Sequence, residues 1–188
     1  MRILIAEDDA VSRTLLKGLL ERFGFEVLVT SGGHEAWERF QRERPKLVIT
    51  DWLMPDLDGL ELTRRIRADR AHHRYVYVMV LTAQSGKRSY MEGMNAGADD
   101  FLVKPFDPDE LLARLRVAER VLKLEDELSR IEALLPTCPD CRKLKQPDGS
   151  WVPLGRAAVK APASSRPICP DCSRDRGRRA LDGLSRPA

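Results

Sequence analysis

The 188-residue sequence has no cysteine before residue 138, only three histidines, and no long apolar segment. A helix that spans a bilayer needs about 20 consecutive apolar residues. The longest apolar runs, such as residues 75–81, are far shorter, which excludes membrane insertion. The N-terminal residues also lack the long apolar region and small-residue cleavage site of a secretory signal. We therefore expect a cytoplasmic protein.

Composition and length are those of a globular protein with one domain and an appendage, or with two small domains. Hydrophobic residues make up 43% of the chain and charged residues 32%. The overall net charge is +3, but residues 136–188 contain 11 Lys and Arg against 5 Asp and Glu. The first 135 residues are therefore acidic. This asymmetry indicates two parts with different roles, the second either simply solvated or in contact with something anionic.

Strand-like and helix-like segments alternate along the first two thirds of the chain. Short apolar runs predict five strands, at 2–6, 26–30, 46–51, 76–82 and 100–103. Helical spacing predicts helices at 10–23, 31–43 with Ser31 as its cap, 60–68, 87–95 and from residue 108 onward. Strands this apolar need cover on both faces, which favours a parallel sheet between helical layers. We predict an α/β fold with a doubly wound, five-stranded parallel sheet.

Charged and polar residues follow four of these strands. Glu7 and Asp8 follow the first strand, Asp51 and Thr82 end the third and fourth, and Lys104 follows the fifth. Ligands of such sheets bind beyond the carboxyl ends of the strands. Clustered carboxylates repel one another unless a cation lies among them, and Mg²⁺ prefers oxygen ligands. One carboxylate could then act as a nucleophile toward a phosphoryl group.

Four segments in this order resemble the response-regulator receiver domain over about residues 1–122. They are Ile-Leu-Ile-Ala-Glu-Asp-Asp at 3–9, Thr-Asp-Trp-Leu-Met-Pro-Asp-Leu-Asp-Gly at 50–59, Leu-Thr-Ala at 81–83, and Gly-Ala-Asp-Asp-Phe-Leu-Val-Lys-Pro-Phe at 97–106. The resemblance implies a flavodoxin-like sheet with strand order 2-1-3-4-5. It also implies a phosphoacceptor protein rather than an enzyme, with only self-catalysed phosphoryl transfer and slow dephosphorylation.

The same resemblance assigns the metal site. Asp51 matches the phosphoacceptor and a Mg²⁺ ligand, Asp8 a direct ligand, and Glu7 an acid that acts largely through a water molecule. Leu53 would offer its backbone carbonyl to the metal. Asp9 lies one place beyond the usual acidic pair, so we expect a secondary role for it.

The resemblance also assigns the phosphoryl contacts and the switch. Thr82 and Lys104 match the residues that contact the phosphoryl group, and Lys104-Pro105 matches a cis peptide bond of the family. Thr82 and Phe101 match the two switch residues of the family. The position of Phe101 is often tyrosine, and because phenylalanine lacks the hydroxyl group, Phe101 would act by packing alone. The sequence contains no histidine in a kinase-like context, so the donor would be a sensor histidine kinase, another phosphotransfer protein or a small phosphodonor.

Residues 117–135 predict a stalk that continues the last helix of the receiver. Apolar residues recur there at alternating spacings of four and three, namely Val117, Val121, Leu124, Leu128, Ile131 and Leu135. This narrow stripe favours a parallel homodimeric coiled coil. The alternative is one amphipathic helix that folds back onto its own domain.

Two Cys-Pro-Asp-Cys motifs follow, Cys138 to Cys141 and Cys169 to Cys172, separated by 27 residues. Two such pairs can complete a tetrahedral Cys₄ zinc site. We predict a small zinc-ribbon-like module at 136–175 with a structural Zn²⁺, followed by a flexible basic tail at 176–188. A redox-active pair that forms disulfides is the alternative.

Taken together, the sequence predicts a phosphorelay response regulator that carries its switch to an unidentified protein partner through the stalk and the zinc module. The alternative is a transcription regulator whose zinc module binds DNA. Zinc knuckles beside arginines can contact nucleic acid, but no recognition helix is visible in the sequence.

Overall fold

The computed structural model describes residues 1–69, 74–83, 86–134, 136–138, 140–141, 143–146, 149–153 and 168–174. The chain divides into two compact units, residues 1–125 and 126–188. The predictions made for Leu135 and for the tail at 176–188 lie outside the described residues. No helix in the described part of the chain is both long and apolar enough to cross a membrane.

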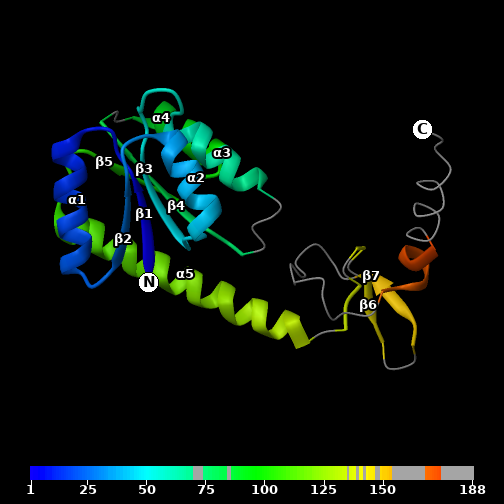
Figure 1. Cartoon of the computed structure of the whole chain (residues 1–188). Coiled ribbons are helices and arrows are strands. Elements are labelled where there is room, and N and C mark those ends of the chain that lie inside the picture. Colours follow the sequence, from blue (N-terminus) through cyan, green and yellow to red (C-terminus); the bar gives the residue numbers. More distant parts are fainter. Residues whose placement is uncertain are drawn as a thin grey trace, which may run out of the picture. The chain divides into compact units, whose positions relative to one another are not determined.

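The first unit is built on a five-stranded parallel sheet (Figure 1). Its strands are β1 (Arg2–Ala6), β2 (Glu26–Thr30), β3 (Leu47–Asp51), β4 (Tyr77–Thr82) and β5 (Asp100–Val103). Their order is β2-β1-β3-β4-β5, which confirms the predicted order. In the register, Asp51 pairs with Leu81 and Thr82 with Val103. The carboxyl ends of β3, β4 and β5 therefore lie along one edge of the sheet.

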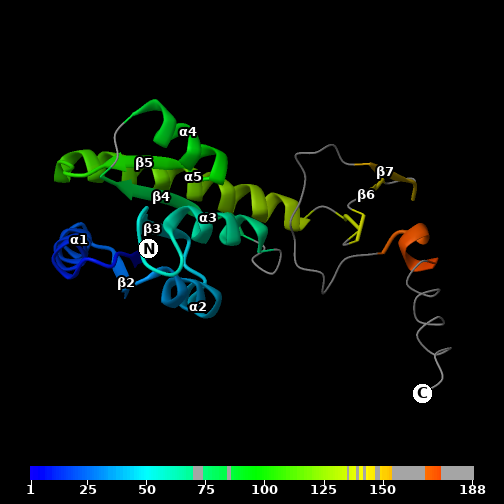
Figure 2. The same cartoon turned by 90° about the horizontal axis from the view of Figure 1, so that it is seen from above.

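Five helices connect and cover these strands. They are α1 (Ala10–Arg22), α2 (Gly33–Glu43), α3 (Gly59–Ala68), α4 (Lys87–Ala96) and α5 (Pro108–Leu134). Figures 1 and 2 show α1 and α5 on one face of the sheet and α2 and α3 on the other. The apolar clusters agree with this arrangement, because α1 and α5 share one cluster and α2 and α3 share another.

Alternation along β1 explains the two layers. Ile3 and Ile5 belong to the cluster under α1 and α5, whereas Leu4, between them, belongs to the cluster with Phe40 of α2. Successive side chains of a strand point to opposite faces. Because all three residues of β1 are buried, the strand needs cover on both sides, as the sequence predicted.

The predicted cap of α2 is wrong. Gly32, not Ser31, is the N-cap residue, and it offers no side-chain bond to the helix. Instead, the Ser31 backbone N–H and hydroxyl donate to Glu35 Oε2, at 2.8 and 2.9 Å. The cap lies one residue later than predicted, because a carboxylate of the first helical turn accepts hydrogen bonds from Ser31.

Within the second unit, β6 (Lys143–Lys145) and β7 (Trp151–Pro153) form an antiparallel pair. The segment before β6 folds back on it, since Cys138 N–H donates to the Lys143 carbonyl at 2.9 Å. Residues 170–174 form a short helical turn. These elements carry the four cysteines.

Candidate functional site

Three carboxylates meet where β1 and β3 end. Glu7, Asp8 and Asp51 each offer an oxygen, and these oxygens lie within 4.8 Å of one another. Glu7 is almost completely buried, with a side chain that is 1% exposed, while Asp8 is exposed and Asp51 intermediate. The cluster therefore has a buried floor and an open side, as a site that admits a ligand from solvent requires.

Lys104 brings a positive charge into direct contact with two of these carboxylates. Its Nζ donates to Glu7 Oε2 and to Asp51 Oδ2, both at 2.6 Å. It follows β5, where its backbone N–H donates to the Thr82 carbonyl at 2.7 Å. The Lys104-Pro105 peptide bond is cis, as predicted. The end of β5 thus brings an ammonium group to the acids of β1 and β3.

The charges of the cluster are only partly neutralised by Lys104, so a further cation would stabilise the carboxylates. Burial raises the pKa of Glu7 to about 7, and the nearby Asp51 charge acts in the same direction. The hydrogen bond from Lys104 lowers this pKa but does not outweigh burial. Burial alone would lower the pKa of Lys104, but its hydrogen bonds to Asp51 and Glu7 raise it above its usual value. Glu7 Oε1 is buried and has no hydrogen-bond partner. Buried carboxylate oxygens need such a partner, and a divalent cation with oxygen ligands fits this one.

The backbone around the acidic pair is fixed from α1. The Arg13 guanidinium donates to the carbonyls of Glu7 and Asp8, at 2.8 and 2.9 Å. Asp9 is the N-cap residue of α1, and its Oδ1 accepts from Ser12 N–H at 2.7 Å. These contacts hold the turn after β1 so that the two preceding acids point toward Asp51.

The backbone around Asp51 is fixed from α3. Trp52 N–H donates to the Leu81 carbonyl at 2.8 Å, and the Trp52 carbonyl accepts from Gly59 N–H at 2.9 Å. A Cβ at Gly59 would lie 2.0 Å from the Asp51 carbonyl oxygen. Only glycine allows the start of α3 to come so close to the residue that carries the carboxylate.

Comparison with known proteins identifies this arrangement. The family model described as "Response regulator receiver domain" matches residues 3–116. The chain belongs to this family. Receiver domains are phosphoacceptor signalling domains rather than enzymes in the usual sense, they interact with histidine kinases or phosphotransfer proteins, and they typically use Mg²⁺ at the acidic pocket.

Individual relatives agree with the family match. The receiver is 40% identical over 127 residues to response regulator MprA of Mycobacterium ulcerans, covering 68% of this chain and 53% of MprA. It is 35% identical over 119 residues to chemotaxis protein CheY1 of Helicobacter pylori strain J99, covering 62% of this chain and 95% of CheY1. The chain thus spans about half the length of MprA and nearly all of CheY1.

Among solved structures, the receiver domain of Francisella response regulator 1452 has a TM-score of 0.59 and 30% identity. That match covers 63% of this chain and 96% of the Francisella chain. The BeF₃-activated receiver domain of Klebsiella pneumoniae RstA also has a TM-score of 0.59, with 31% identity over 63% of this chain and 97% of its own. The four cysteines lie beyond the residues that the family model matches.

The predicted switch residues of the receiver are both buried. Thr82 ends β4 at the same edge as Asp51. Phe101 is 7% exposed, and its ring packs edge-on against Trp52, with centroids 5.5 Å apart and planes at 87°. Gly93 of α4 lies against this ring, because a Cβ there would be 2.3 Å from a Phe101 ring carbon. Phe101 therefore touches Trp52, the residue after Asp51, on one side and α4 on another.

One predicted ligand of the receiver, Leu53, and the secondary role expected for Asp9 stay predictions. Leu53 follows Asp51 by two residues and has an exposed side chain, so only its backbone could reach a metal. Asp9 is used as a helix cap and is not one of the three acids that come together.

Sequence reasoning missed the residues that position the receiver site. Arg13 and Gly93 gave no signal, because an arginine or a glycine within a helix is common. Arg67 was also missed: it donates to the carbonyls of Gly97 and Val76 and to Asp99, at 2.7, 2.7 and 2.6 Å. This side chain joins α3 to the start of β4 and to the loop before β5. Its partners are distant in sequence, so no local pattern could indicate them.

A groove of about 740 Å³ lies beside the acidic cluster of the receiver. Its lining includes Glu7 and Lys104 from the site, Leu15 and Leu19 from α1, and Phe106. The groove thus reaches Glu7 and Lys104 of the site from the side of α1.

Proposed function

We propose that this receiver accepts a phosphoryl group on Asp51, with Mg²⁺ held by Glu7, Asp8 and Asp51, from a histidine kinase or phosphotransfer protein. The observation that carries the proposal is the cluster of three carboxylates within 4.8 Å, with the Lys104 ammonium bound to two of them. A bound Mg²⁺ would neutralise charge on the transferring phosphoryl group.

The side chains have distinct tasks in this reaction. An Asp51 carboxylate oxygen attacks phosphorus, the bond from phosphorus to the donor nitrogen breaks, and an acyl phosphate forms. Lys104 already bonds Asp51 and can follow the new negative charge by shifting to a phosphoryl oxygen. The Thr82 hydroxyl would donate to another phosphoryl oxygen. The same groups, with a water molecule as the nucleophile, would support slow self-dephosphorylation.

Labelling with a small phosphodonor tests the assignment of Asp51. In the presence of Mg²⁺, the wild-type chain should gain one phosphoryl group, measured as a mass increase of the intact protein. Asp51→Asn should gain none, because an amide is a poor nucleophile and cannot form the acyl phosphate. Asp56→Asn is the matched control, since Asp56 is an exposed acid of the same loop with a positive φ that asparagine tolerates.

Equal labelling of wild type and Asp51→Asn would reject the proposal. Labelling of wild type that survives complete removal of divalent cations would reject the metal part alone. The two outcomes separate the nucleophile from its cofactor.

We further propose that α5 and the cysteine-containing unit carry the switch onward to a protein partner. Three residues of the predicted seam, Val117, Leu124 and Leu128, are 41%, 60% and 54% exposed. Exposed apolar residues at this spacing indicate a partner helix. A second copy of α5 fits, because a parallel pair would place Arg120 of one helix opposite Glu125 of the other.

A protein partner is favoured over DNA by the charges of the second unit. Lys143 and Arg174 both bind the Asp171 carboxylate, at 2.7 and 2.8 Å. This pairing reduces the positive charge that these side chains can offer to phosphates. Binding of duplex DNA that weakens steeply with salt would overturn this preference.

A further inference from the structure

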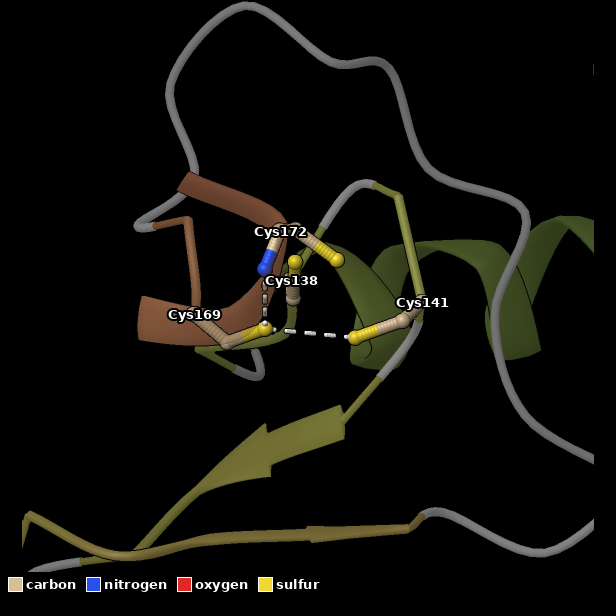
Figure 3. A group of neighbouring side chains, drawn as sticks. All are labelled: Cys138, Cys141, Cys169 and Cys172. Atoms are coloured by element: carbon tan, nitrogen blue, oxygen red, sulfur yellow. Dashed lines mark hydrogen bonds between the residues drawn. The ribbon is translucent and has the colours of Figure 1, made fainter. Parts of the chain in front are cut away.

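We propose that Cys138, Cys141, Cys169 and Cys172 bind one Zn²⁺ ion in a closed structural site. One sulfur from each residue lies within 4.8 Å of the sulfurs of the other three. Figure 3 shows the four side chains turned toward a common centre, two from the segment before β6 and two from the helical turn at 170–174 and the residue before it. This proposal does not depend on phosphorylation of Asp51.

The thiols are gathered without being bonded to one another. All four cysteines are free, and the Sγ atoms of Cys141 and Cys169 are 3.4 Å apart. A disulfide requires about 2.05 Å between its sulfurs. Sulfurs bound to one tetrahedral metal at about 2.3 Å lie apart by somewhat less than 4 Å, so the spacing fits ligands of a shared ion.

Each Cys-x-x-Cys pair is shaped to present two sulfurs on one side. In the second pair, Cys172 N–H points to Cys169 Sγ at 3.5 Å, and Ser173 N–H donates to the Cys169 carbonyl at 2.9 Å. In the first pair, Cys138 N–H donates to the Lys143 carbonyl at 2.9 Å, which holds the pair against the start of β6. Metal ligation uses the thiolate form, and an N–H group directed at sulfur, such as that of Cys172, stabilises it.

Charged side chains tie the two pairs together. Lys143, which begins β6 just after the first pair, binds Asp171, which lies between the two cysteines of the second pair, at 2.7 Å. Arg174 binds the same carboxylate. Four thiolates and one Zn²⁺ carry a net charge of −2. The Lys143 ammonium interacts electrostatically with Cys141 and Cys169, and with Arg174 it outweighs the single charge of Asp171, so the trio would offset part of that charge.

Zinc is the metal that these ligands favour. Tetrahedral sulfur sites hold zinc or iron, and zinc binds thiolate ligands more tightly than ferrous iron in the usual affinity order. Four protein ligands leave no open position for water or substrate, so the site is structural rather than catalytic. Apart from the end of α5, the described part of this unit contains a pair of three-residue strands and a short helical turn, and such small elements cannot bury a large core. Metal binding would supply much of its folding free energy.

Metal analysis of the full-length protein, purified under reducing conditions, tests this site. Elemental analysis should find one zinc per chain and no iron. The double variant Cys141→Ser/Cys172→Ser, which alters the two less buried ligands, should lose at least nine tenths of the zinc. Lys145→Ser, an exposed change in the same unit, should keep it.

Limited proteolysis provides a second readout. The wild-type chain should resist cleavage within residues 136–153 and 168–174 when zinc is bound and become sensitive there after treatment with a strong chelator. The receiver should stay intact in both cases, and re-addition of zinc should restore protection.

Three results would overturn the proposal: no stoichiometric metal in wild type, iron with visible thiolate charge-transfer absorption, or two disulfides in freshly purified protein. Phosphodonor labelling of the double cysteine variant separates the two proposals. It should equal that of wild type, and Asp51→Asn should retain full zinc.

Discussion

At the scale of single residues, three consecutive acidic side chains have different contacts. Glu7, Asp8 and Asp9 are consecutive, yet only the first two join Asp51. Asp9 instead caps α1 through Ser12 N–H. The unsatisfied N–H groups of a helix N-terminus attract such a side chain. The acidic run is therefore divided between the candidate metal site and the backbone of the helix that follows.

Glu35 is a second acid whose carboxylate accepts a hydrogen bond from a backbone N–H group, and mutation can test its contribution to stability. Its carboxylate accepts from the backbone N–H and hydroxyl of Ser31, and the backbone bond is the main cause of a pKa below the usual value. Glu35→Gln should lower the free energy of unfolding at neutral pH by less than about 1 kcal/mol, because the carboxylate is mostly solvated. Urea denaturation of both proteins measures the difference.

The pH dependence of that difference has a definite sign. A carboxylate whose pKa is depressed by folding stabilises the protein above its unfolded pKa, and this contribution disappears as pH falls through the folded pKa. The stability advantage of wild type over Glu35→Gln should therefore be complete at neutral pH and shrink in acid below 4.5, the ordinary pKa of a glutamate side chain. An advantage that grows on acidification would contradict the role given to Glu35.

The gathering of the acids and the lysine was predictable from their joint pattern, because each ends or follows an apolar strand of one parallel sheet. The roles assigned to Asp51 and Lys104 stay predictions. Arg13 and Arg67 act through backbone carbonyls, which any sequence offers, so only coordinates reveal them. Ser31 was misassigned because a serine before a helix normally caps it, and the competing Glu35 contact is a matter of geometry.

At the scale of elements, the strands were the easiest part to predict. Each strand of the central sheet is a short apolar run that ends in a polar residue or a turn, and the observed bounds differ from the predicted ones by at most one residue. The close contacts between elements were not predictable. Gly59 and Gly93 allow α3 and α4 to approach Asp51 and Phe101, but a glycine in a sequence does not say what it faces.

The contact between α4 and β5 can be tested by a pair of helical glycines. Gly93→Ala should lower the free energy of unfolding by about 1–3 kcal/mol, because its methyl group would enter the Phe101 ring position. Gly18→Ala in α1 has no heavy atom within 4 Å of the added Cβ. It should raise stability by about 0.5–1 kcal/mol through helix propensity.

Chemical denaturation of both glycine variants measures these opposite effects. A higher free energy of unfolding for both variants would show that helix propensity alone governs the two positions. Similar stability of Gly93→Ala and wild type would mean that Phe101 can move aside without loss, and thus that α4 does not hold the ring.

At the scale of the whole molecule, α5 is the element that the receiver and the cysteine-containing unit share. It begins at Pro108 within the first unit and ends at Leu134 within the second. One stripe, with Leu111, Leu115 and Leu122, is buried in the receiver core, whereas Leu124 and Leu128 are exposed. A helix with one stripe buried and another exposed is suited to pairing while it stays packed on its own domain.

We predict that the chain forms a reversible dimer through this exposed stripe. The interface would be short, and the sequence places glutamate at both 127 and 132, the next flanking pair after Arg120 and Glu125. Like charges there weaken pairing. Sedimentation velocity should therefore show a dimer that dissociates on dilution. Leu124→Lys should give a monomer, whereas Met91→Lys, an equally drastic change on exposed α4, should leave the dimer intact.

Charge reversal distinguishes a parallel pair from other arrangements. In a parallel dimer, Arg120→Glu would face Glu125 of the second helix and should raise the dissociation constant several-fold. The double variant Arg120→Glu/Glu125→Arg restores opposite charges and should recover most of the affinity. Recovery supports the parallel arrangement, since the coupling of these two positions requires them to meet across the interface. Additive losses in the double variant, or a wild-type chain that stays monomeric at the highest concentration reached, would exclude it.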